Sequence, residues 1–380
     1  PTRTSLTGYT ISVRGDKNAG NWLWGIQANT ESPEFETNDM GRLQSGDDLE
    51  LSGDINYRMT DPGRVFRSWR LGVFGETRWN YDWDRGETRL ELFGNAQFAN
   101  YLEADLELYH TLRSQSDDLT RGGPLMGTGR NAGVELRVNS NFAAPTQWSI
   151  EGEYATGEYG ALLRSLEAEL QVRPSPKWSL SINPEWFRYN DPRQYVTTVE
   201  GGAPETFGSR YIFATVDQSV LSVQFRFNYT FTPDLTLETY AEPFTASGHY
   251  SAYGELPAPG RRDLRLYGTD GTTITESGDE FLDVTDSRYG GSFQLPREDF
   301  NLFSLRTNAV LRWEWRRGST LYLVWQQNRS ASCDFFAAPA DCPTGRPPGS
   351  LSKPGFLGDV FGIPGDNFLA IKVSYWIPLR

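Results

Sequence analysis

The sequence has no run of about eighteen consecutive apolar residues, so a protein that crosses a membrane with helices is excluded. Cysteine, histidine and methionine are scarce, at 2, 2 and 3 residues in a chain of 380, which leaves little material for metal sites or thiol chemistry. Acidic residues outnumber basic ones, 49 to 36, and the net charge of −13 excludes a general nucleic-acid binder. We therefore expect no cofactor, no metal centre and no nucleic-acid partner.

Aromatic residues and glycine are abundant. The chain contains 12 Trp, 18 Tyr, 22 Phe and 38 Gly, and aromatic residues make up 14% of it. A disordered acidic chain would carry few aromatic residues. A chain that is polar on average, yet rich in aromatic residues and glycine, is typical of a transmembrane β-barrel, in which apolar residues alternate with polar ones.

Alternation with a period of two is clear at 221–231, 303–316 and 369–377. In the first segment every second residue from Leu221 to Phe231 is apolar. Segments of about 10–14 residues exceed the usual strand length of about five to six residues, and they suit a tilted crossing of a bilayer. We predict an all-β, antiparallel transmembrane outer-membrane β-barrel, with a soluble β-sandwich as the alternative.

The polar side of these strands carries full charges in mid-strand, which suits a water-filled lumen. Opposite charges such as Arg312 and Glu314 on one face favour mutual pairing, whereas a selective channel would use the charges to choose solutes. Both interpretations stay open for the predicted lumen-facing charges: Glu135, Arg137, Glu151, Glu153, Glu167, Glu169, Arg226, Arg306, Arg312 and Glu314.

The connections between strands fall into two classes. Turn residues cluster at 60–63, 173–176, 232–234 and 317–318. Long connections are predicted near 31–47, 114–130, 189–218, 247–302 and 330–365. When the strands run antiparallel, all long connections fall at one end and all these turns at the other, as in a barrel with long outer loops and short periplasmic turns. We predict roughly 14–16 or more strands, near 4–14, 20–30, 48–60, 66–81, 86–98, 102–113, 131–139, 147–156, 161–172, 177–188, 219–231, 235–246, 303–316, 319–329 and 366–379.

The strand order also bears on domain organisation. With the last strand ending in the periplasm, the strand near 4–14 runs in the same direction, whereas bacterial barrels normally hold an even number of strands. We therefore interpret residues 1–380 as a C-terminal barrel that is incomplete on its N-terminal side, with at least one strand and a signal peptide upstream.

Four segments, in order along the chain, resemble hallmarks of one family of bacterial outer-membrane proteins. That family joins a domain like the family 9 carbohydrate-binding modules to a C-terminal barrel of unknown function. The resemblance implies an upstream carbohydrate-binding-like domain but no activity. Arg42 stands where the family would have an aromatic residue. The four segments are residues 32–41, 121–126, 229–250 and 300–325.

Two of these segments contain loop candidates for a plug or a ligand site, namely Asn38, Asp39, Arg121, Gly122, Gly123 and Pro124. The alternative is purely structural. In that interpretation glycine and proline set turn geometry, and the Asn and Asp side chains cap backbone donors.

The loops contain two further candidate features. Cys333 and Cys342 lie in a proline-rich outer loop, where an oxidising compartment favours a disulfide. The acidic stretch from Asp270 to Asp286 offers oxygen ligands for calcium. It lacks the regular spacing of a calcium loop, so we expect a solvated acidic loop.

Catalysis is the weakest interpretation. A barrel hydrolase needs a histidine within hydrogen-bond reach of a serine or carboxylate at the outer rim, and only His110 and His249 exist. We expect both to make ordinary hydrogen bonds.

The sequence thus predicts a non-enzymatic barrel in the outer membrane of a Gram-negative-type bacterium, where it contacts lipid and passes or imports a small solute. A saccharide is one candidate solute, because of the resembled upstream domain. The alternative is a closed barrel that anchors or docks protein partners of a larger surface or periplasmic assembly.

Overall fold

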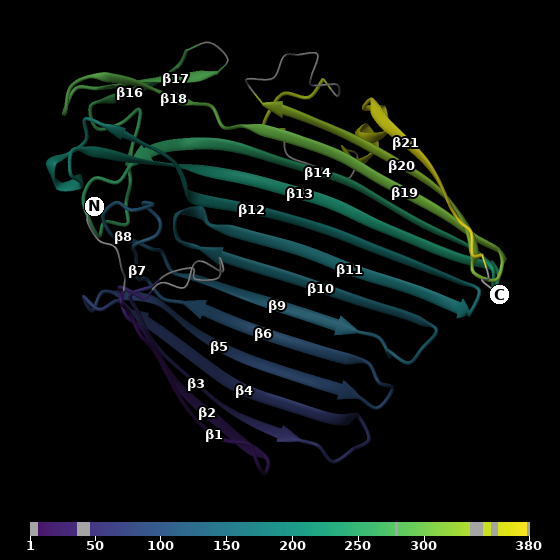
Figure 1. The fold of residues 1–380 in the computed structure, drawn as a ribbon. Coiled ribbons are helices and arrows are strands. Elements are labelled where there is room, and N and C mark those ends of the chain that lie inside the picture. The colour runs from purple at the N-terminus through teal and green to yellow at the C-terminus, as the bar shows by residue number, and fades with distance from the viewer. Residues whose placement is uncertain (1–6, 36–45, 278–279, 335–344, 351–355, 378–380) are drawn as a thin grey trace.

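The computed structural model describes residues 7–35, 46–277, 280–334, 345–350 and 356–377. Most of the strands form a single 16-stranded sheet in which sequential neighbours pair antiparallel (Figure 1). The prediction of an all-β antiparallel fold is therefore confirmed. The strands along the sheet are β1 (Thr10–Lys17), β2 (Trp22–Glu31), β3 (Asp48–Met59), β4 (Phe66–Trp79), β5 (Arg85–Phe98), β6 (Glu103–Thr111), β9 (Asn131–Asn139), β10 (Thr146–Gly157), β11 (Leu162–Ser175), β12 (Trp178–Glu200), β13 (Ser209–Thr232), β14 (Leu235–Glu255), β19 (Phe300–Arg316), β20 (Ser319–Asp334) and β21 (Gly365–Ser374), with β15 (Arg265–Leu266) paired to β14.

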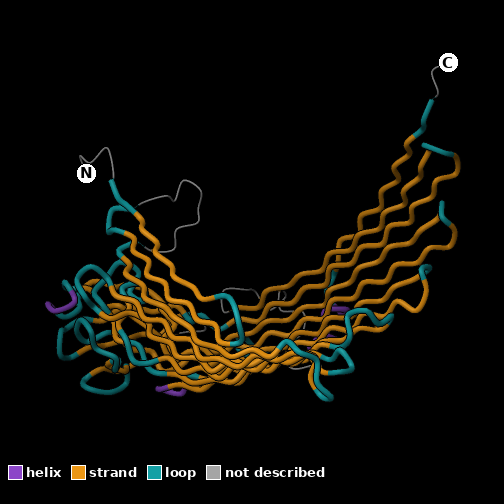
Figure 2. Tube along the Cα trace, turned by 90° about the horizontal axis from the view of Figure 1, so that it is seen from below, coloured by secondary structure: helices purple, strands orange, loops and turns teal. Residues whose placement is uncertain are grey.

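The sheet curves into an open trough (Figure 2). Strands β1 and β21 form the two edges, and in the described residues they do not pair with each other. The described sheet is therefore open, and the predicted transmembrane barrel is not confirmed. Closure requires hydrogen bonds between the first and last strands, and each of these two strands has a single neighbour here.

The long connections leave from one end of the sheet and the predicted turns lie at the other, whereas the short connections at 80–84 and 158–161 share the end of the long ones (Figure 1). The turns at 60–65, 176–177, 233–234 and 317–318 lie at one end. Connections 112–130, 256–299 and 335–364 leave from the other. We refer to these as the turn end and the loop end.

Two of the predicted long connections are largely strand. The segment 189–218 consists of the ends of β12 and β13 joined by residues 201–208, and β14 continues to Glu255. Register shifts between Asp191 and Gln194, and between Tyr195 and Thr197, interrupt the alternation. Because a bulge moves the following side chains to the other face, the period of two is lost in the sequence while the ladder continues.

This extension of β12–β14 beyond the neighbouring strands is packed on both faces. On one face, Ile212 and Ala214 join Val284 and Leu295 in a buried cluster. Val284 and Leu295 come from a separate sheet formed by β16 (Thr272–Ser277), β17 (Phe281–Asp286) and β18 (Ser292–Pro296). On the other face, Phe213 packs against Met126 and Leu256. Much of the hydrophobic core thus lies at the loop end.

A third buried cluster surrounds the short helix α1 (Phe356–Asp359). Phe356 and Val360 pack on Phe303 and Leu305 of β19, together with Cys333 of β20. Among the described residues, no helix is long and apolar enough to cross a membrane.

Four charged side chains join the small sheet to the extension. Arg210 of β13 donates to Asp286 (2.7 Å) and to Glu255 (2.9 Å). Arg265 donates to the same two carboxylates at distances of 2.8–2.9 Å. All four side chains are buried. The expectation of a solvated acidic loop is therefore wrong for Asp286, because two guanidinium groups neutralise its carboxylate.

Candidate functional site

The two faces of the sheet differ in chemistry. We call the face that carries Glu151 the polar face and the face that carries Ile150 the apolar face. In β2, Trp24 and Ile26 of the apolar face are 45% and 54% exposed, whereas Gln27 on the polar face is half-buried. Because side chains converge on the inner side of a curved sheet, this difference indicates that the polar face is the concave one (Figure 2).

Strand register places all ten predicted lumen-facing charges on the polar face. Residues directly opposite in an antiparallel pair share a face. Glu135 lies opposite Glu153, and Arg137 lies opposite Glu151, which in turn faces Glu167. The remaining members follow from the register through β11–β14 and β19: Glu169, Arg226, Arg306, Arg312 and Glu314.

Part of this charge is paired across or along strands. The Arg137 Nε donates to Glu151 Oε2 at 2.6 Å. The Arg312 Nη2 donates to Glu314 Oε2 at 3.1 Å, as the sequence predicts. These contacts fix side-chain direction on a wet surface, where each pair contributes about 0–1 kcal/mol.

Carboxylates gather in a cavity of about 460 Å³ on the polar face of β9–β13. Four glutamates line it against a single cationic side chain, Arg137. Asn and Gln side chains complete a wall without large apolar groups. This part of the trough is suited to attract cations and to repel anions. The four glutamates are Glu151, Glu167, Glu169 and Glu185.

Several polar-face residues were not predicted from the sequence. Glu185 lies opposite Glu167, and Glu107 opposite Glu135. Both were detectable, because they alternate with apolar residues within predicted strands.

Tyr109 was also missed, and its role depends on the tertiary structure. Its hydroxyl donates to Glu153 Oε1 at 2.6 Å, so the side chain reaches from β6 over β9 to β10. Gly133 of β9 makes room for it, since a Cβ there would lie 2.4 Å from the Tyr109 ring. A glycine beneath an aromatic ring has no local signature in the sequence.

The loop motif at 121–124 packs at the loop end. The Arg121 guanidinium lies 4.5 Å from the Tyr195 ring centroid of β12, and Gly123 lies directly against the Tyr211 ring of β13. The Pro124 carbonyl accepts a hydrogen bond from the buried Thr120. Gly122 has a φ of 93°, which requires glycine. These contacts favour the structural interpretation of the motif, and Asn38 and Asp39 lie outside the described residues.

Replacing Gly123 with alanine is expected to loosen this loop. The new Cβ would lie 2.2 Å from the Tyr211 ring, so the ring must move out of the cluster around Met126 and Phe213. Overpacking of this kind destabilises by about 1–3 kcal/mol. Trypsin should cleave after Arg121 several-fold faster than in the parent protein. Gly358→Ala, whose Cβ meets nothing within 4 Å, is the control and should not change the rate.

The cysteine and histidine predictions have different outcomes. Cys333 is buried and disulfide-bonded, and its predicted partner Cys342 lies outside the described residues. His110 is not at a polar rim but on the apolar face, opposite Leu90 and Ala132. His249 Nδ1 lies 2.9 Å from Asp299 Oδ2, while Asp299 Oδ1 accepts the Tyr250 backbone N–H. This pair meets one requirement of the hydrolase alternative, but its described hydrogen bonds include no serine hydroxyl.

A comparison with protein families identifies the chain. The profile described as "Domain of unknown function (DUF5916)" matches residues 2–338. The chain belongs to the DUF5916 family. The match covers the whole sheet up to β20, and it does not show the carbohydrate-binding-like domain, which stays a prediction.

The search of curated proteins found no match to this sequence. Solved structures resemble the chain only loosely. One is a bacterial polysaccharide outer membrane secretin, with 10% identity and a TM-score of 0.33 over 96% of this chain and 87% of that one. Another is the siderophore receptor PirA from Acinetobacter baumannii, with 9% identity and a TM-score of 0.35 over 96% of this chain and 63% of that one. Similarity at this level does not identify the fold.

Proposed function

We propose that the chain forms the wall of an outer-membrane β-barrel that passes small polar solutes, with a preference for cations, and performs no catalysis. The observation that carries this proposal is the division of one long-stranded sheet into an apolar face with exposed large side chains and a polar face with four clustered glutamates. Lipid would cover the apolar face, and the polar face would line the channel.

Aromatic side chains at the turn end support a membrane boundary there. Trp22, Phe231, Trp313 and Trp315 are all exposed near the turns that join adjacent strands. Trp148 is exposed at the same end of β10. Rings of Trp, Tyr and Phe at the edge of an apolar band are typical of transmembrane barrels.

Function as a channel requires that the two open edges of the sheet, at β1 and β21, each gain a partner strand within the membrane, because unpaired backbone groups at a sheet edge are costly in lipid. The proposal therefore includes closure of the sheet. Docking of protein partners is the second candidate, and it is favoured by the amount of packed structure at the loop end.

Single-channel conductance of the full-length protein in a planar bilayer tests the proposal. The parent protein should conduct steadily and prefer cations. A variant with Glu151→Gln, Glu167→Gln, Glu169→Gln and Glu185→Gln should show a several-fold lower cation-to-anion permeability ratio, because the wall loses its negative field. The reversal potential in a salt gradient measures this ratio.

The control carries the same number of changes at exposed positions in turns and loops, and it should keep the parent selectivity: Asp61→Asn, Asp82→Asn, Glu205→Gln and Asp234→Asn. A silent bilayer would contradict the channel and favour the docking role. Equal selectivity in all three proteins would show that the glutamates do not line the path of ions.

A further inference from the structure

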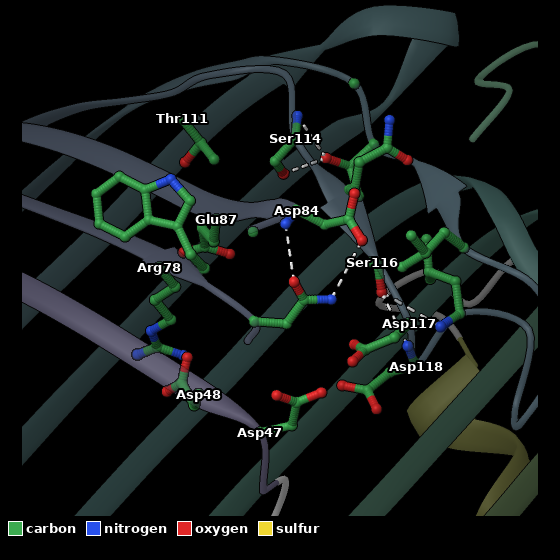
Figure 3. A pocket seen from close by; sticks show the side chains of 18 of the residues that line it. Asp47, Asp48, Arg78, Asp84, Glu87, Thr111, Ser114, Ser116, Asp117 and Asp118 are labelled. Atoms are coloured by element: carbon green, nitrogen blue, oxygen red, sulfur yellow. Dashed lines mark hydrogen bonds between the residues drawn. The ribbon is translucent and has the colours of Figure 1, made fainter. Parts of the chain in front are cut away.

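A second cavity, of about 420 Å³, lies at the loop end of β3–β6 and β9 (Figure 3). Asp48 and Arg78 line it from β3 and β4, and Thr111 and Asn131 from β6 and β9. By register these side chains lie on the polar face. The segment 114–119 also lines it; we call this segment the roof and the lining strand ends the floor. The volume lies within the range of about 300–1,000 Å³ of small-molecule sites.

The lining is strongly acidic. Arg78 is the sole cationic side chain among the lining residues, and its Nε lies 3.3 Å from Glu50, a carboxylate outside the cavity. Asp47 accepts the Tyr81 backbone N–H, and Asp84 accepts the Asn80 amide, so these two are held in place. The cavity therefore has an excess of negative charge from six carboxylates: Asp47, Asp48, Asp84, Glu87, Asp117 and Asp118.

Three uncharged polar groups in the wall also lack partners. The Thr111 residue is only 8% exposed, and within the described residues its hydroxyl makes no hydrogen bond. The oxygens Gln115 Oε1 and Asn131 Oδ1 are buried and have no hydrogen-bond donor among the described residues. Both are acceptors only. An unpaired buried acceptor costs about 1–3 kcal/mol, so this wall is held at a cost in stability, and the Thr111 hydroxyl is the group that a ligand with N–H donors would meet.

The pKa of an aspartate in the segment 114–119 is consistent with a positively charged ligand. Burial, and then the adjacent Asp117 carboxylate, raise the pKa of Asp118 above its ordinary value. A nearby positive charge would oppose this rise in pKa, since it favours the ionised form.

A single metal ion does not fit the arrangement. Within the described parts of the chain, no three carboxylate, histidine or cysteine groups converge closely enough to hold a metal. Six carboxylates that do not converge on one point, together with the Thr111 hydroxyl, suit several positive charges on one flexible chain. Each of these charges carries hydrogen-bond donors.

We propose that this cavity binds a linear polyamine, an aliphatic chain with two or more ammonium groups. Each ammonium would donate to carboxylates of the floor or the roof, and one of them would also donate to the Thr111 hydroxyl. The site does not depend on conduction, because the cavity is formed by five strand ends and one loop of the sheet as it stands.

Isothermal titration calorimetry with spermidine on the full-length protein in detergent tests this proposal. The parent protein should bind one spermidine, more weakly as salt is added. Asp117→Asn with Asp118→Asn should weaken binding at least tenfold. Asp61→Asn with Asp82→Asn removes two exposed loop carboxylates outside the cavity and should leave the affinity unchanged.

Thr111→Val tests the inner end of the cavity, because it keeps the shape of the side chain and removes the acceptor. Affinity should fall several-fold while the thermal unfolding midpoint in the absence of ligand stays near that of the parent. Absence of spermidine binding would overturn the proposal, as would Ca²⁺ or Mg²⁺ that binds at the same site more tightly than spermidine. Equal weakening in the loop control would show non-specific attraction. A conductance failure leaves this titration interpretable, because binding is measured in micelles.

Discussion

Asp286→Ala is expected to release the small sheet β16–β18 from the extension of β12–β14. The Asp286 carboxylate accepts hydrogen bonds from both Arg210 and Arg265, and all three side chains are buried. Removing it leaves Arg210 with Glu255, and Arg265 with Glu255 and the exposed Asp270. Breaking a buried charge pair costs about 3–5 kcal/mol. Amide hydrogen exchange in residues 265–296 should rise by orders of magnitude, while exchange in β9–β11 stays unchanged.

The matched control is Asp283→Ala, three residues earlier on β17, where the carboxylate pairs with the exposed Gln294. That change should alter exchange little, since a solvent-exposed hydrogen bond contributes about 0.5–1.5 kcal/mol. Similar exchange in both variants would show that the hydrophobic cluster around Val284, and not the buried charges, holds the small sheet.

The Asp286 carboxylate also determines how the contact between the small sheet and the extension of β12–β14 depends on pH. Hydrogen bonds from Arg265 and then from Arg210 hold the pKa of Asp286 well below its ordinary value. A carboxylate with a lowered pKa stabilises the folded state fully above its unfolded pKa of about 3.9, and this contribution is lost as the pH falls towards the folded value. Exchange in the small sheet should therefore be constant from neutral pH down to about 5, after correction for intrinsic rates, and should rise only below about 4.

Arg193→Ala is expected to free two connections at once. The buried Arg193 guanidinium of β12 donates to the Gly127 and Arg262 carbonyl oxygens and stacks over the Tyr159 ring at 4.1 Å. Each charged hydrogen bond contributes about 1.5–3 kcal/mol, and both are lost with the side chain. Proteolysis within 112–130 and 256–264 should accelerate together by at least tenfold.

Arg130→Ala provides the control, because Arg130 lies at the end of the same loop with an exposed side chain. It contacts Glu158, to which Arg113 also donates, so one cation remains. Its removal should change cleavage less than twofold. Acceleration of only one of the two segments in Arg193→Ala would contradict a shared anchor.

Local patterns in the sequence determined the strands and the character of their two faces. The strand at 131–139 was predicted with the bounds observed for β9, and the ten predicted charges share one face. This succeeds because side chains in a strand alternate strictly between two sides, so a short segment shows which residues share a side. The short turns were predictable for a similar reason, since Pro, Gly and Asp restrict the backbone locally.

Features that join distant segments were decided only by the tertiary structure. Arg210 and Asp286 are 76 residues apart, and the acidic cavity combines residues from positions 46 to 131. The ends of β12 and β13 were mistaken for a loop, because bulges and burial on both faces removed the alternation there. Whether two charged or polar groups from distant segments meet depends on the strand register and on the curvature of the sheet. Hydrogen bonds along whole strands determine both, so neither can be predicted from a single segment of the sequence.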